Sequence, residues 1–354
     1  MSDLLQNTIK MIQPLDKEVM AKAQARQDML TKPQGSLGRL EEVSIRLAGI
    51  QEKALPRIEQ KAVITMAGDH GVVAEKVGNF PQEVTAQMVY NFLAGGAAIN
   101  AVAKQVGARV VVVDMGVAAD LGDKPQLISR KIAPGTKNMS QGPAMTQEQA
   151  VEAIEAGIEV VADEAAKGLD IVGTGDMGIG NTTSSAAIYA VMTRQAVHDV
   201  TGRGTGLTDE QLAHKVSVIQ RAIKTNCPDP KNPLDVLAKV GGFEIAGLAG
   251  VMLGAAARHI PVVIDGFISG AAALIATALA PELKNYLFAG HRSAEAGHRL
   301  GLEYMGMKPL IDLDMRLGEG TGSALGIFLA ETATKILAEM ATFGEAGVSD
   351  KEEE

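Results

Sequence analysis

Short, nearly continuous hydrophobic runs recur along the chain, and each run ends in a glycine. The runs are Val63–Gly68, Val110–Gly116, Ile171–Gly175 and Val262–Gly266, with two further candidates at Tyr286–Gly290 and Leu310–Gly318. A strand without alternating polar positions is buried on both faces, which is typical of a parallel sheet covered by helices. The pattern therefore predicts that these runs are parallel strands.

The segments between the runs have the periodicity of amphipathic helices. In the clearest segment, Thr146 and Gln149 have the spacing of a capping box, and Gly168 stands where a helix would end. Its apolar residues fall on one stripe: Val151, Ile154, Ile158, Val161 and Ala165. This alternation of strands and helices predicts a Rossmann-like α/β fold, in which ligands bind beyond the carboxyl ends of the strands.

The two ends of the chain have a different pattern. Leu15–Met29 and Arg39–Leu55 have the pattern of charged amphipathic helices, and Leu325–Met340 carries a third apolar stripe. We therefore predict a small helical domain built from residues 1–60 and 325–354, beside a Rossmann-like α/β catalytic domain at 61–324.

Composition narrows the classes of function. The chain of 354 residues has a formal charge of -9, seven Phe, four Tyr and no Trp. The small number of aromatic residues and the net negative charge argue against a nucleic-acid partner. The single cysteine, Cys227, excludes an intramolecular disulfide and suits a reducing compartment. No signal peptide pattern or membrane-spanning run is visible, so we expect a cytoplasmic protein with no membrane span.

Three glycine-rich loops predict an anion site. Gly173–Ala187 follows a buried strand and opens into an alanine-rich helix, so its backbone N–H groups and the helix dipole would hold a phosphate. It lacks the Gly-Lys-Ser/Thr ending of a Walker loop. Thr201–Gly206 leads to Lys215, and Gly290–His298 offers Ser293 to the same anion.

One carboxylate is a candidate proton acceptor. Glu319 stands between Gly318 and Gly320, just before an apolar helical run, where the glycines would let a flat ligand approach closely. A turn carrying a solvated acid is the alternative interpretation. His291, Glu295 and His298 lack His-Glu-x-x-His spacing, so we predict no metal site.

Eight ordered segments carry a family resemblance. They are Lys32–Gly38, Ala67–Val72, Gly178–Ser185, Val200–Gly206, Gly242–Gly247, Asp265–Gly270, Gly290–Glu295 and Arg316–Ser323. Together they resemble the nicotinate-nucleotide:dimethylbenzimidazole phosphoribosyltransferases of cobalamin synthesis, in family order from about residue 30 to residue 340.

The resemblance implies transfer of 5-phosphoribosyl from nicotinate mononucleotide to 5,6-dimethylbenzimidazole, which gives α-ribazole 5'-phosphate and nicotinate. It implies a homodimer that uses no cofactor or metal, with Glu319 as the proton acceptor. The residues that it implies for phosphate and ribose binding are Gly178, Gly180, Asn181, Gly204, Lys215 and Ser293. Those that it implies for base binding are Asn79, Gln87, Met88 and Leu317.

The chain departs from the family pattern at Asp176, where the family often has Glu. Because the shorter side chain withdraws the carboxylate, we expect Asp176 to support the ribose or the base electrostatically rather than to transfer the proton.

Other classes of function fit less well. A magnesium-dependent phosphoribosyltransferase would show adjacent acids, and no Asp-Asp pair occurs in the sequence. A dehydrogenase would need an acid about 20 residues after the start of Gly173-x-Gly-x-x-Gly178, and the segment Ala190–Arg194 offers none. A non-catalytic nucleotide-binding module remains open.

Overall fold

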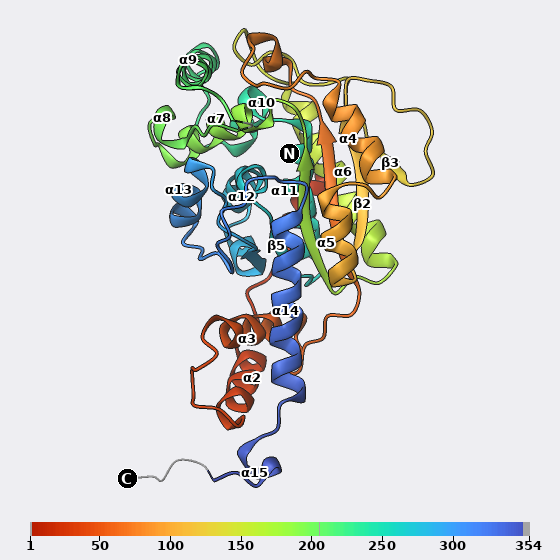
Figure 1. Cartoon of the computed structure of the whole chain (residues 1–354), viewed down its shortest axis with the longest axis vertical. Helices are drawn as coiled ribbons and strands as arrows, with labels where there is room; N and C mark the ends of the chain where they lie inside the picture. The colour runs from red at the N-terminus through yellow and green to blue at the C-terminus, as the bar shows by residue number, and fades with distance from the viewer. Residues whose placement is uncertain (1, 205, 350–354) are drawn as a thin grey trace.

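A six-stranded parallel sheet forms the centre of the protein (Figure 1). The computed structural model describes residues 2–204 and 206–349. The strands are β1 (Lys61–Gly68), β2 (Arg109–Gly116), β3 (Leu127–Ser129), β4 (Ile171–Met177), β5 (Val262–Ile264) and β6 (Leu287–Ala289). Their order, β3-β2-β1-β4-β5-β6, is that of a doubly wound sheet, so the predicted α/β class is confirmed.

Five of the six predicted runs form strands, and the sixth does not. Leu310–Gly318 is a loop, in which only Ile311 makes an isolated bridge, to His291. Asp312, Leu313 and Asp314 are exposed there, because the segment runs over the surface instead of entering the sheet. The three-residue strand β3 was not predicted, since it is too short to leave a hydrophobic run.

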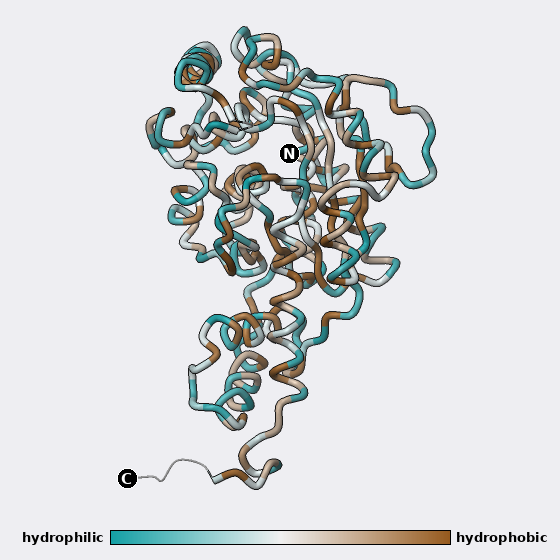
Figure 2. Tube along the Cα trace, in the orientation of Figure 1, coloured by the Kyte–Doolittle hydropathy of each residue, from teal (hydrophilic) through white to brown (hydrophobic). Residues whose placement is uncertain are grey.

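Helices cover both faces of the sheet. α5 (Ala98–Val106) and α14 (Thr321–Glu339) contact one face, while α11 (Phe243–Ala256) and α12 (Phe267–Leu279) contact the other. α6 (Gln147–Ala166) packs on α11, and its predicted capping box between Thr146 and Gln149 is present. Figure 2 shows the hydrophobic colouring concentrated along the strands and the helices packed on them.

The remaining helices lie around the sheet, except α15, which lies beyond the end of α14 (Figure 1). They are α1 (Asp3–Met11), η1 (Gly71–Glu75), α4 (Val84–Leu93), α7 (Asn181–Thr193), α8 (Val197–Val200), α9 (Asp209–Asn226), α10 (Pro233–Val240), η2 (Pro281–Tyr286), α13 (Ala296–Met305) and α15 (Phe343–Ala346). Within residues 2–204 and 206–349, no helix has the length and hydropathy needed to cross a bilayer.

Helices from both ends of the chain pack together beyond the sheet. α2 (Lys17–Met29) and α3 (Arg39–Gln51) lie beside the second half of α14 (Figure 1). Ala23, Ala48 and Leu337 form a small buried cluster between these three helices. α1 instead contacts α6 and α11 on the sheet. The division into domains at residues 60 and 325 stays a prediction. Residues 1 and 350–354 of the predicted helical domain, and residue 205 of the predicted loop Thr201–Gly206, lie outside the described residues.

Glycines set the close approach of α6 and α11. A methyl group at Gly250 would overlap the carbonyl oxygen of Ile154, and one at Gly157 would overlap that of Gly247. We expect Gly250→Ala to lower the free energy of unfolding by about 1–3 kcal/mol, because two helix backbones must separate. Denaturant unfolding measures this loss. Gly142→Ala is the control, since a methyl group there meets open space, and an equal effect of both variants would contradict the prediction.

Candidate active site

A cleft of about 410 Å³ opens at the carboxyl edge of the sheet. β1 and β4 are neighbours in the sheet, although β2 and β3 come between them in the sequence. β2 and β3 extend the sheet on one side of β1, and β5 and β6 extend it on the other side of β4, so the strand order reverses between β1 and β4. Loops that follow parallel strands leave a crevice at such a point. The cleft is lined by the loops after β4, β5 and β6, together with Asn79, Lys215 and the segment that ends at Gly318.

The amino end of α7 and one buried lysine form the cationic end of the cleft. Asn181 begins α7, so the first N–H groups of the helix lie beside the cleft lining. Lys215 is 1% exposed, and its Nζ donates a hydrogen bond to Thr182 Oγ1 at 2.8 Å. Burial lowers the pKa of Lys215 to about 8, while the nearby carboxylate of Glu295 opposes the shift. The arrangement suits an anionic group such as a phosphate.

Ser293 lines the same cleft from the loop after β6. Its backbone N–H donates to His298 Nδ1 at 2.8 Å, and its Oγ accepts a hydrogen bond from Glu295 N at 3.3 Å. Burial lowers the pKa of His298 to about 3, so this histidine is neutral and accepts the bond. The hydroxyl hydrogen of Ser293 is thereby left for another acceptor.

Asp176 lies on the cleft wall at the end of β4. Its Oδ2 accepts a hydrogen bond from Asn181 Nδ2 at 3.0 Å, and its buried Oδ1 has no protein partner among the described residues. Burial raises the pKa of Asp176 well above its usual range, and the carboxylates of Asp265 and Glu244 raise it further. Asp176 is therefore suited to a hydrogen bond with a polar group of a ligand.

Glu319 lies next in sequence to Leu317 and Gly318, which line the cleft, but is not itself part of the lining. It is 6% exposed, and its Oε2 accepts a hydrogen bond from Ile99 N, at the start of α5, at 3.2 Å. Burial raises the pKa of Glu319, while the bond from Ile99 opposes this shift. A raised pKa suits a carboxylate that accepts a proton near neutral pH.

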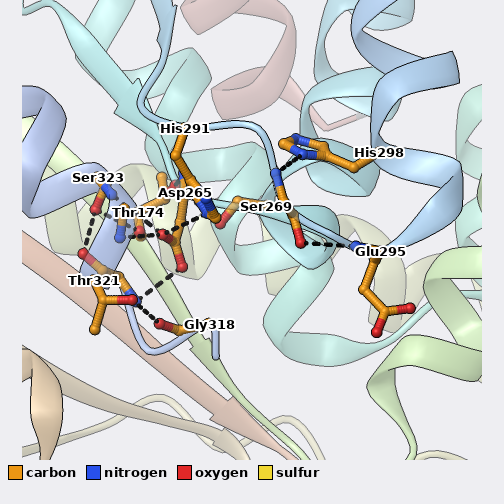
Figure 3. A network of polar contacts seen from close by, with 12 residues as sticks. Thr174, Asp265, Ser269, His291, Glu295, His298, Gly318, Thr321 and Ser323 are labelled. Carbon is orange, nitrogen blue, oxygen red and sulfur yellow. Dashed lines mark hydrogen bonds and ion pairs between the residues drawn. The ribbon is translucent and has the colours of Figure 1, made fainter. Parts of the chain in front are cut away.

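The backbone at Glu319 is in the left-handed region, with φ of 63°. Gly318 and Gly320 flank it with φ of 82° and 101°, which glycine adopts without strain. A residue other than glycine in this region is uncommon and is often found at functional sites. Neighbouring side chains, Asp265 among them, hold this turn at the start of α14 (Figure 3).

A second buried network lies behind the loop after β4. His70 Nε2 is 2.7 Å from Glu244 Oε1, and His70 Nδ1 is 3.1 Å from Ser184 Oγ. Ser184 belongs to α7 and Glu244 to α11, so the network ties both helices to the loop after β1. All three side chains are buried. Since solvent and ligands do not reach them, we assign the network to support of the anion-binding loop.

Most of the residues predicted from the sequence meet in this cleft. Asn79, Asp176, Gly178, Gly180, Asn181, Gly204, Lys215, Ser293 and Leu317 line it. Three predicted residues do not: Glu319, Gln87 and Met88. Leu317 is 58% exposed, and Glu319 is covered by the start of α5. Gln87 and Met88 lie on α4, which is anchored to the anion loop by a hydrogen bond from Ile179 N to Thr85 Oγ1.

Sequence reasoning missed several residues that line the cleft, namely Phe80, Thr182, Arg203, Glu295 and Arg316. Thr182 was within reach of prediction, because it lies inside the anion loop. Arg203 lies inside the predicted loop Thr201–Gly206 and Arg316 begins the family segment Arg316–Ser323, so both were also within reach of prediction. In the part of the chain that the structure describes, no group of three or more His, Cys, Asp or Glu side chains could hold a metal ion.

Comparisons with known proteins agree on one family. Residues 12–348 match the phosphoribosyltransferase family. Curated relatives named nicotinate-nucleotide--dimethylbenzimidazole phosphoribosyltransferase include one from Roseiflexus sp. (strain RS-1), 61% identical, and one from Dehalococcoides mccartyi (strain BAV1), 59% identical. Each of these matches extends over 350 residues and covers 99% of both chains.

A solved structure shows the same relation. The crystal structure of nicotinate-nucleotide-dimethylbenzimidazole phosphoribosyltransferase from Thermus thermophilus is 48% identical to this chain, with a TM-score of 0.90. The match covers 95% of this chain and 100% of the other. The chain therefore belongs to the nicotinate-nucleotide--dimethylbenzimidazole phosphoribosyltransferase family.

Proposed function

We propose that this protein transfers 5-phosphoribosyl from nicotinate mononucleotide to 5,6-dimethylbenzimidazole, with Glu319 as the proton acceptor. The observation that carries the proposal is one cleft with cationic groups at Lys215 and the start of α7, and a buried carboxylate of raised pKa, Glu319, next to the lining residues Leu317 and Gly318. The names of the full-length relatives support the choice of substrates.

The reaction needs few catalytic groups. In nicotinate mononucleotide the pyridinium nitrogen is already cationic, so nicotinate leaves with the electron pair of the broken bond and needs no acid. An unprotonated ring nitrogen of the benzimidazole forms the new bond to the ribose from the opposite face, which converts a β-linked donor into an α-linked product. The ring thereby becomes cationic, and the Glu319 carboxylate removes the N–H proton of its other nitrogen.

Buried acids favour the cationic transition state. Breaking the bond to nicotinate gives the ribose oxocarbenium character, which nearby negative charge stabilises. Asp176 contributes through its Oδ1, which has no protein partner among the described residues, by a hydrogen bond to the ribose. Lys215, Ser293 and the start of α7 would hold the phosphate.

Lys215 gives a testable dependence on pH. We expect Lys215→Met to raise the KM for nicotinate mononucleotide about 10- to 100-fold, because a charge-assisted bond to the phosphate is lost. In the wild type, KM rises as the pH rises through about 8, where Lys215 loses its proton, and the variant lacks this rise. Steady-state kinetics between pH 6 and pH 10 measure both effects. Lys224→Met, on the exposed face of the same helix, is the control, and an equal effect there would contradict the assignment.

Incubation of the purified protein with both substrates tests the proposed function directly. We expect a ribosylated benzimidazole and free nicotinate in equal amounts, separated by chromatography. A non-catalytic nucleotide-binding module would bind nicotinate mononucleotide without releasing nicotinate, and that result would refute the proposal.

We propose further that the protein acts as a homodimer in the cytoplasm, as the family resemblance implies. Sedimentation of the purified protein tests the first statement, since a monomer at working concentration would contradict it. Fractionation of the source cells tests the second.

A further inference from the structure

Asp265 holds the turn that carries Glu319 (Figure 3). It directly follows β5, is fully buried and does not line the cleft. Its Oδ2 accepts a hydrogen bond from Gly320 N at 3.0 Å, and its Oδ1 accepts bonds from Gly322 N at 2.7 Å and Ser323 N at 3.2 Å. Three donors from one turn therefore converge on one side chain.

Asp265 is itself held in place by its neighbours. Its backbone N–H donates to Thr174 Oγ1 at 3.2 Å, and Thr174 Oγ1 donates to Ser269 Oγ at 3.0 Å. Ser323 Oγ also donates to the carbonyl oxygen of Thr174 at 2.9 Å. These bonds join β4, β5, α12 and α14, so the carboxylate has little freedom to follow a moving turn.

The peptide unit between Glu319 and Gly320 is fixed at both ends. Thr65 Oγ1 donates to the carbonyl oxygen of Glu319 at 2.9 Å, while the N–H of Gly320 donates to Asp265. Glu319 needs such support, because its φ of 63° is unfavourable for a residue with a side chain. A shift of the turn that breaks these bonds would move the backbone that carries the Glu319 carboxylate.

We propose that Asp265 is a positioning residue that keeps the Glu319 carboxylate aimed at the acceptor base. This inference rests on the proposed function, in which Glu319 takes the proton. The plainer alternative is that Asp265 only caps α14 and adds stability, as acids at helix amino ends commonly do. The two roles predict different kinetics.

The variant Asp265→Asn distinguishes the positioning role from the helix-capping role. The asparagine amide has a single acceptor oxygen, so its NH2 group must face either Gly320 N–H or the pair at Gly322 and Ser323, and the turn has to shift. We expect kcat to fall about 100-fold, because a displacement on the scale of an ångström has that effect in a catalytic site. We expect the KM values to change by less than about threefold, because Asp265 does not line the cleft.

Two matched variants complete the design. Asp114→Asn removes another buried carboxylate, one that accepts backbone N–H bonds from Gly116 and Val117 away from the cleft, and we expect kcat to stay unchanged there. In the Glu319→Gln background, Asp265→Asn should lower the remaining kcat by less than about twofold, since it acts through a group already lost. Thermal unfolding of every variant is measured alongside.

The outcomes are distinct. A large drop in kcat that vanishes in the Glu319→Gln background supports the proposal. An unchanged kcat with lower thermal stability, or the same fractional drop in both backgrounds, overturns it. If Asp265→Asn does not fold, Thr65→Val tests the other end of the same peptide unit, with an expected fall in kcat of about tenfold and the same coupling to Glu319. A wild-type protein that forms no product would instead refute the proposed function on which the inference rests.

Discussion

Glu319→Gln lowers kcat about 100- to 10,000-fold while both substrates still bind, because a general base contributes that much to a rate and the amide cannot take a proton. The change is nearly isosteric, and the amide oxygen of glutamine can still accept the hydrogen bond from Ile99 N. Steady-state kinetics together with calorimetric binding of each substrate measure the two effects separately.

The pH profile and a control variant sharpen the result. Burial raises the pKa of Glu319, so the wild-type kcat/KM falls as the pH drops through that pKa and the carboxylate becomes protonated. The Glu319→Gln variant lacks this limb. Glu339→Gln, at the exposed carboxyl end of α14, should leave kcat unchanged. Wild-type turnover in Glu319→Gln would remove Glu319 from the mechanism.

The largest expected loss of stability follows from His70→Ala. His70 Nε2 is 2.7 Å from Glu244 Oε1, and both side chains are fully buried. Removal of one member of a buried pair leaves the other without a partner, which costs about 3–5 kcal/mol. The second carboxylate oxygen of Glu244 already has no protein partner among the described residues, so no other group is in place to compensate. Denaturant unfolding measures the loss.

Two further variants test the cause of that loss. His198→Ala breaks an exposed pair with Asp199 and should have little effect, because exposed ion pairs contribute little to stability. Adding Glu244→Leu to His70→Ala should restore part of the lost stability, since the unpaired buried carboxyl group is then gone. If the double variant recovers no stability, lost packing and not the unpaired carboxyl group of Glu244 is the main cause of the loss.

Much of the fold could be predicted because buried parallel strands leave continuous apolar runs. β1, β2 and β4 each supply seven or eight consecutive residues, most of them buried. β3 supplies only three, and the Leu310–Gly318 run has the same apolar start but lies on the surface. Local pattern does not distinguish a short buried strand from a surface loop, because tertiary packing decides between them.

The candidate site was predictable where its residues lie close together in sequence. The loop from Gly178 to Asn181 is contiguous, and Glu319 is marked by its two glycines. The contacts of Asp265 were not predictable, because its three donors lie 55–58 positions away and meet it only through the strand order. The burial of Glu319 by the start of α5 is likewise a long-range contact, with 220 positions between the two residues.

The rate on an acceptor base that lacks the N–H proton tests the central claim most directly. A benzimidazole methylated on one ring nitrogen can still attack the ribose through the other, but it has no ring proton for Glu319 to remove. We predict that the wild type exceeds Glu319→Gln about 1,000-fold with 5,6-dimethylbenzimidazole and by less than about threefold with the N-methylated base. An equally large difference with both bases would contradict proton transfer to Glu319.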